Sequence, residues 1–281
     1  MNTDVMDSRS LSTSRGDRSF IKTLARFGYI AKGVVYSTVG ILAASAVFGW
    51  FGISGARGTR GAIEAIASQP FGNFLLIALV AGLAGYVIWR FVQGILDTED
   101  KGSDASGWAQ RIGFMISGLM YTALAWYAVS QSGWFSSSNS GSSQKQEFMS
   151  EVMSSEAGIL AVGLFGAGFA LVGLYQGYRA LTKKFKENWR TAELSSSEER
   201  FATRLAQVGV GVRAVTFVII GGLVIKAAMD ADPAEATGLG EALRTIGEQP
   251  FGQILLAVSS FGLICYGIYC FVNSRYRAMT I

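Results

Sequence analysis

Histidine is absent from this 281-residue sequence. Its absence removes the usual acid/base group near neutral pH and the commonest metal ligand in proteins. It also excludes Ser-His-Asp and Cys-His catalysis and the ligation of haem by imidazole. No other set of nucleophile, base and metal ligands is recognisable, so we expect no enzymatic activity, no metal ion and no cofactor.

Cysteine and proline are scarce, with two and three residues against 35 glycines. Cys265 and Cys270 lie in one apolar run, on different faces of a helix, so neither a disulfide nor a metal pair is expected between them. Many glycines with few prolines are typical of closely packed membrane helices rather than of disordered linkers.

Acidic residues are missing from six long apolar runs. Half of all residues are apolar and only 16% are charged. Each run is long enough to cross a hydrocarbon core, which takes about 20 helical residues. The sequence therefore predicts an all-α integral membrane protein with six transmembrane helices, at residues 24–50, 70–96, 109–131, 157–182, 205–229 and 250–273.

The runs form three tandem copies of a two-span repeat, which points to a repeated architecture. The segment Arg26–Tyr36 matches Arg111–Tyr121 and, more weakly, Gln207–Phe217. At the start of the even spans, Gln69–Gly72 returns as Gln249–Gly252. We divide the chain into a polar N-terminal segment and three helical-hairpin repeats, at residues 1–23, 24–100, 101–186 and 187–281. Whether the repeats close into a pseudo-three-fold bundle or pack side by side stays open.

A short amphipathic segment precedes the second span of each repeat, at residues 62–66, 147–153 and 241–246. Apolar residues three to four apart predict a helix that lies in the membrane interface. Pro70 and Pro250 follow the first and third segments, and we expect each to begin an even span, where a missing N–H has no cost.

Basic residues set the predicted orientation. Most of the 24 Lys and Arg residues fall in the N-terminal segment, the second and fourth loops and the C-terminus. Both termini are therefore expected in the cytoplasm, and the net charge of +4 needs no nucleic-acid partner. The tryptophans are expected in aromatic belts at the two membrane boundaries: Trp50, Trp126 and Trp134 at the outer one, and Trp89, Trp108 and Trp189 at the inner one.

The repeated Arg-x-Gly-x-x-x-x-Gly-x-x-Tyr pattern and the Gln-Pro-Phe-Gly segments resemble the bacterial membrane family called domain of unknown function 1206. The resemblance extends from about Leu24 to Tyr276 and implies a bacterial inner-membrane location, but no activity. The third copy departs from the pattern, with Gln207 in place of Arg and Phe217 in place of Tyr. Three two-helix repeats are also similar in plan to the mitochondrial carriers, whose proline-acid-base signature is missing here.

Lys32, Ser117 and Arg213 occupy the same position in the three repeats. Lys32 follows Arg26 by six residues, which places it about 9 Å deeper along a helix. Charges within the membrane are costly and mark functional sites. One interpretation is a site for an anion or a lipid head group at these three residues. The favoured alternative is that the two cationic side chains snorkel to phospholipid head groups.

Repeated glycines and tyrosines are assigned structural roles. The glycines are expected to let helices approach closely. They are Gly28, Gly33, Gly82, Gly85, Gly113 and Gly118. Tyr36 and Tyr121 lie in mid-span, where interhelical hydrogen bonds are expected for their hydroxyls. Gln93 and Gln176 are expected at the membrane interface.

Two functions remain open. The leading hypothesis is a transporter-like or channel-like bundle for a small solute or anion. The alternative is an accessory or scaffold protein that binds lipids, a hydrophobic cofactor or membrane-protein partners, including a second copy of itself. The lack of carboxylates and histidines within the spans argues against proton-coupled transport.

Overall fold

Six long helices dominate the computed structural model, which describes residues 15–49, 58–98, 102–132, 150–231 and 239–278. All six are long and apolar enough to cross a membrane, so the all-α, six-span prediction is confirmed. In the described residues the only β-structure is an isolated bridge between Trp189 and Arg277. The long helices are α1 (Arg15–Phe48), α3 (Gly72–Leu96), α4 (Ala105–Gln131), α6 (Glu156–Thr182), α7 (Ser196–Met229) and α9 (Gly252–Tyr276).

The described connecting segments include the short helices α2 (Thr59–Ala67), η2 (Lys184–Asn188), η3 (Thr191–Glu193) and α8 (Leu239–Gly247). α2 and α8 are the amphipathic helices predicted in the first and third repeats. α2 buries Ile63 and Ile66, and it is held to α4 by a hydrogen bond of 2.5 Å from the Tyr127 hydroxyl to the Glu64 carboxylate. The corresponding segment of the second repeat falls largely outside the described residues.

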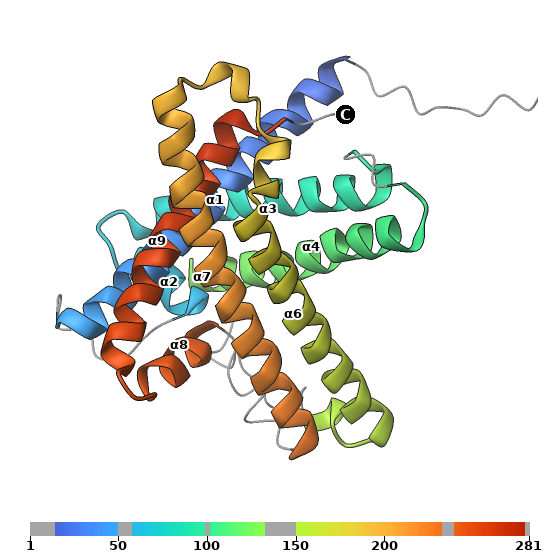
Figure 1. Cartoon of the computed structure of the whole chain (residues 1–281), viewed down its shortest axis with the longest axis vertical. Coiled ribbons are helices and arrows are strands. Elements are labelled where there is room, and N and C mark those ends of the chain that lie inside the picture. The colour runs from blue at the N-terminus through green and yellow to red at the C-terminus, as the bar shows by residue number, and fades with distance from the viewer. Residues whose placement is uncertain (1–14, 50–57, 99–101, 133–149, 232–238, 279–281) are drawn as a thin grey trace, which may run out of the picture.

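The long helices pair across the boundaries between repeats. The most extensive contacts join α3 to α4, α6 to α7, and α9 to α1. Each pair thus combines the second span of one repeat with the first span of the next. The pair of α9 and α1 joins the last span of the sequence to the first, and the three pairs run in different directions across the molecule (Figure 1).

The second repeat differs from the other two, because its two spans do not pack together. α1 also packs on α3, and α7 on α9, but α4 and α6 do not pack along each other. Only 17% of the most apolar stretch of either α4 or α6 is buried, against 61% for α1. The core therefore lies around α1 and α9, and α4 and α6 present apolar side chains outward.

The turns into α3 and α9 have the same conformation. Phe71 and Phe251 both have φ of 62°, in the left-handed region that L-residues seldom adopt. A Cβ on Gly72 would lie 2.0 Å from the carbonyl oxygen of Ala67, so only glycine fits there. The two prolines, Pro70 and Pro250, precede these turns, and the helices begin two residues after them rather than at them.

Side-chain caps at Asp104, Ser155 and Ser195 start α4, α6 and α7. Asp104 caps α4 by accepting from the Gly107 N–H at 3.0 Å, and this hydrogen bond lowers the pKa of the Asp104 carboxyl. Ser195 and Glu198 form a capping box at the start of α7. The run of three serines and two glutamates allows two registers of this motif, and the structure uses the one that begins at Ser195, not at Ser196.

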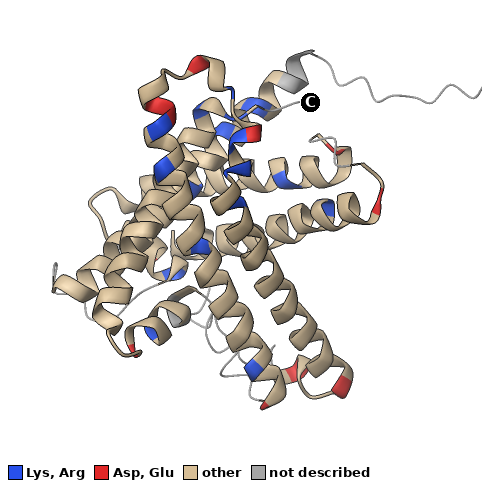
Figure 2. Ribbon diagram, viewed as in Figure 1, with Lys and Arg blue, Asp and Glu red and all other residues tan. Residues whose placement is uncertain are grey.

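The link from α6 to α7 is fastened to the C-terminal segment. The N–H of Arg190 donates to the carbonyl of Tyr276 at 2.9 Å, and the N–H of Ala278 donates to the carbonyl of Asn188 at 2.8 Å. Trp189 is buried and donates through its indole N–H to Asn273 at 3.1 Å. The start of α1, the start of α7 and the end of α9 share the part of the molecule where most Lys and Arg gather (Figure 2).

The aromatic belt is only partly as predicted. Trp108 and Trp126 are exposed, as a lipid-facing belt requires, but Trp89 and Trp189 are buried in the protein core, so the belt role predicted for them is wrong. Trp50 and Trp134 lie outside the described residues.

Candidate functional site

Lys32 lies inside the bundle and not at its surface. Its side chain is 3% exposed, and its Nζ donates to the Tyr86 hydroxyl at 2.9 Å. The ammonium nitrogen also lies 4.9–6.0 Å from the ring centroids of Tyr36, Tyr86, Tyr121 and Tyr266. Cations are attracted to aromatic rings at such distances. The snorkelling interpretation is therefore wrong for Lys32, because four helices enclose its side chain.

Arg213 approaches the same tyrosines from α7. Its guanidinium carbon lies 4.1 Å from the Phe217 ring centroid, 4.9 Å from that of Tyr266 and 5.7 Å from that of Tyr36. Its Nε donates to the Tyr36 hydroxyl at 3.4 Å, and its Nη1 donates to the Gln176 amide oxygen. These inward contacts exclude snorkelling for Arg213 as well.

Arg90 is a third cation at this place; it lies within the predicted span 70–96 but was not among the candidate site residues. Its Nε donates to the Tyr86 hydroxyl at 2.8 Å and its Nη1 to the Gln93 amide oxygen at 3.0 Å. The Tyr86 hydroxyl thus accepts from both Lys32 and Arg90. The repeat alignment could have identified Arg90, because Arg90 occupies the position that Gln176 holds in the second repeat, and Gln176 accepts from Arg213.

These contacts define one cluster, which we call the cation–tyrosine cluster. Tyr36 and Tyr121 meet within it at 3.5 Å between their hydroxyls. Gln93 and Gln176 are buried beside it, so the prediction that they lie at the membrane interface is wrong. The cluster consists of Lys32, Arg90, Arg213, Tyr36, Tyr86, Tyr121 and Tyr266.

Ser117 is not part of the cluster. It is half-buried and makes no hydrogen bond to Lys32 or Arg213 in the described structure. α4 instead contributes Tyr121, one helical turn further along. The predicted convergence of three equivalent side chains is therefore present for Lys32 and Arg213 and absent for Ser117.

The cluster gathers three basic side chains without an acidic partner. No carboxylate contacts Lys32, Arg90 or Arg213 among the described residues, and the six apolar runs contain no Asp or Glu. Burying a charge is costly unless it is paired or hydrogen-bonded. Tyrosine rings and hydroxyls compensate part of that cost. The remaining positive potential would stabilise an anion at this place.

Glycines position two of the cluster's tyrosines. A Cβ on Gly28 would lie 2.5 Å from the backbone of Tyr86, and one on Gly209 would lie 2.4 Å from the backbone of Tyr266. In the first and third repeats the two spans therefore meet at a glycine directly beside a tyrosine. We call this contact the repeat seam.

The repeat seam is open in the second repeat. A Cβ on Gly113 or on Gly168 would find no atom within 4 Å, so the close packing predicted for Gly113 is wrong. Val172 stands at the tyrosine position of this repeat and is exposed. Outside this seam, the predicted glycines have close neighbours: Phe271 for Gly33, Ala31 for Gly82, Leu24 for Gly85 and Phe91 for Gly118.

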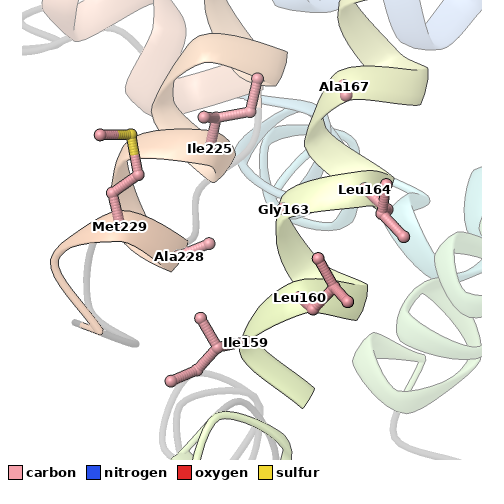
Figure 3. A pocket seen from close by; sticks show the side chains of 8 residues that line it. All are labelled: Ile159, Leu160, Gly163, Leu164, Ala167, Ile225, Ala228 and Met229. Carbon is pink, nitrogen blue, oxygen red and sulfur yellow. The ribbon is translucent and has the colours of Figure 1, made fainter. Parts of the chain in front are cut away.

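An apolar hollow between α6 and α7 is separate from the cluster (Figure 3). It measures about 350 Å³ and is lined by aliphatic side chains and Met229, including Leu160, Leu164 and Ile225. These side chains offer no group that could pair with an ion. The hollow therefore does not extend the charged site.

Comparison with known proteins places the chain in a family. The family model described as Domain of Unknown Function (DUF1206) matches three times, at residues 27–97, 112–183 and 208–277. The chain belongs to this family. The three matches coincide with the three repeats, so in this DUF1206 protein the repeated unit is the family's unit.

The DUF1206 chain is also similar to the uncharacterized protein YxxB of Bacillus subtilis (strain 168). The two are 32% identical over 263 residues, which cover 94% of each chain. No solved structure matches the chain.

Proposed function

We propose that this DUF1206 protein binds a small inorganic anion in the cation–tyrosine cluster and passes it across the membrane. The observation that carries the proposal is the convergence of Lys32, Arg90 and Arg213 at one buried place without a carboxylate. A site with uncompensated positive charge in a low-dielectric interior favours a negative guest.

The tyrosine hydroxyls accept the hydrogen bonds that the cations would donate to the anion. Tyr86 accepts from two cations, and Tyr36 accepts from Arg213. An anion that enters would replace these neutral acceptors, and because it is charged it would accept stronger hydrogen bonds from the cations. The displaced hydroxyls could then donate to the anion. With Lys32 enclosed, rotation of the tyrosine side chains is the step that admits it.

The proposal includes the orientation of the protein in the membrane. Both termini would face the cytoplasm of a bacterium, with the protein in its inner membrane. The gathering of Lys and Arg around the start of α1, the start of α7 and the end of α9 (Figure 2) supports this orientation.

Anion flux into liposomes tests the proposal. The purified protein is reconstituted, and chloride, nitrate and phosphate flux are measured for the wild type, Lys32→Met and Arg213→Met. We expect each variant to lose at least about tenfold in flux, because a lost charge–anion contact contributes about 1.5–3 kcal/mol.

Lys226→Met serves as the matched control. Lys226 lies near the end of α7 and pairs with Asp230 at 3.0 Å, away from the cluster, so its loss should leave flux unchanged. Size-exclusion profiles confirm that each variant is folded. Absence of flux for every anion, or equal flux in all variants, would overturn the proposal.

A second candidate is a membrane protein that binds a partner helix without transport. The open repeat seam favours it, because Gly113 and Gly168 have no neighbour where the other repeats pack helix against helix. A partner helix, or one from a second copy of the chain, would complete this seam in the manner of the first and third repeats.

A further inference from the structure

We infer that a second anion site lies where the start of α1 meets the end of α9, and that it binds a phosphate group. Its residues are Lys22, Arg26, Arg190 and Arg277, which line one pocket of about 110 Å³. One water occupies about 30 Å³ in the liquid, so the pocket has room for a phosphate. The site is independent of the cation–tyrosine cluster and of its proposed transport role.

Three segments far apart in the sequence build this pocket. Lys22 and Arg26 lie one turn apart on α1, on the same face. Arg190 belongs to the link between α6 and α7, and Arg277 follows α9. Backbone hydrogen bonds fasten the link to the C-terminal segment, from Arg190 to Tyr276 and from Ala278 to Asn188. The cations are therefore gathered by the fold.

Comparison with the equivalent residues of the other two repeats shows why Arg26 is available for a ligand. Its equivalent in the second repeat, Arg111, donates to the carbonyls of Gly94 and Ile95 at the end of α3, both at 2.8 Å. The equivalent in the third repeat, Gln207, donates to the Ala180 carbonyl at the end of α6 at 3.1 Å. This repeat position thus normally caps the end of the preceding even span.

In the first repeat another residue performs that capping. The Nη2 of Arg190 donates to the Arg275 carbonyl at the end of α9, at 2.9 Å. Arg26 makes no hydrogen bond or ion pair with any described residue, and neither does Lys22. Their charges point to a ligand from outside the chain.

Charge balance supports the same conclusion. The Glu193 carboxylate accepts from Arg190 at 2.6 Å, so one cation of the pocket has an acidic partner. Lys22 and Arg26 contact no carboxylate among the described residues. Like charges one turn apart on a helix repel each other, as Lys22 and Arg26 do, so a bound phosphate would relieve this repulsion and accept hydrogen bonds from both.

Two sources could supply the phosphate. Phe20 and Phe27 are exposed on α1 beside the two basic residues, as expected where a helix enters the bilayer. The head group of an anionic phospholipid could therefore reach the pocket while its acyl chains follow α1. A soluble phosphate compound could reach the same place from the aqueous side.

Binding of two probes to the purified full-length protein tests the site. The probes are dioctanoyl phosphatidylglycerol and inorganic pyrophosphate, and the readout is the shift of the thermal unfolding midpoint with probe concentration. We expect at least one probe to bind saturably, and the double variant Lys22→Gln/Arg26→Gln to bind it at least about tenfold more weakly, because two charged donors are lost. Neither side chain has a hydrogen-bond or ion-pair partner among the described residues, so the variant should fold.

The matched control is Arg200→Gln/Arg204→Gln, which removes two exposed charges at the start of α7. It should bind the probe like the wild type. Binding of phosphatidylglycerol alone would assign the site to a lipid head group, and binding of pyrophosphate alone to a soluble phosphate. Equal weakening in both double variants would indicate a general surface-charge effect and overturn the inference, as would saturable binding of neither probe.

Discussion

At the scale of single residues, the Tyr86 hydroxyl has the central role in the cluster. Its oxygen accepts from Lys32 and Arg90, and its backbone is fixed by contact with Gly28. Tyr266 holds the same place in the third repeat, but its hydroxyl bonds to neither Lys32 nor Arg213 in the described structure. Equivalent tyrosines therefore differ in what their hydroxyls contribute.

This difference predicts unequal effects of removing each hydroxyl. Tyr86→Phe keeps the ring that attracts Lys32 and removes the acceptor, so two buried cations each lose a hydrogen bond. We expect a loss of about 1–3 kcal/mol in the free energy of unfolding, read as a lower thermal midpoint in detergent. Tyr266→Phe should cost less. An equal effect of the two substitutions would contradict the assigned role of the Tyr86 hydroxyl.

At the scale of elements, the turn that leads into each even span is the most constrained part of the repeat. A Cβ on Gly72, Gly158 or Gly252 would lie within about 2 Å of a carbonyl oxygen of the preceding segment. The first and third copies also keep a phenylalanine in the left-handed region before the glycine, at a cost of about 1–2 kcal/mol. The shared turn sets how each short helix docks against its span.

Gly72→Ala should therefore destabilise the protein. The added methyl group cannot be accommodated without moving the α2–α3 turn, and forced overpacking typically costs about 1–3 kcal/mol. Gly113→Ala is the matched control, because its methyl group would meet open space and alanine favours a helix by up to about 1 kcal/mol. Thermal unfolding in detergent compares the two. A Gly72→Ala midpoint equal to or above that of Gly113→Ala would refute the turn argument.

At the scale of the whole molecule, the sequence predicted the spans and the repeats but not how the spans pair. Apolar length alone locates the helices, since crossing a bilayer demands it. The faces of those helices are harder to assign, because lipid and protein core are both apolar. That is why Trp89 and Gln93 were placed at the interface although they are buried, and why Lys32 was expected to reach the head groups. The pairing of α9 with α1 depends on contacts between the two ends of the sequence, which no local pattern encodes.

The open seam of the second repeat leads to a prediction about assembly. Where the first and third repeats bury a glycine against a neighbouring span, α4 and α6 leave Gly113 and Gly168 facing open space. Small residues on membrane helices allow close helix–helix contact, so a second copy of the chain could insert there. The particle mass in detergent, from light scattering, should then exceed that of one 30.0 kDa chain.

The double variant Gly113→Leu/Gly168→Leu should reduce the particle mass to that of a single chain, because leucine side chains would fill the seam. Gly211→Leu/Gly222→Leu is the matched control, since these glycines of α7 also face open space but lie outside the seam. A wild-type particle of one chain, or a seam variant that assembles like the control, would contradict self-association at the seam. Preserved anion flux in a monomeric seam variant would then separate transport in the cation–tyrosine cluster from assembly through α4 and α6.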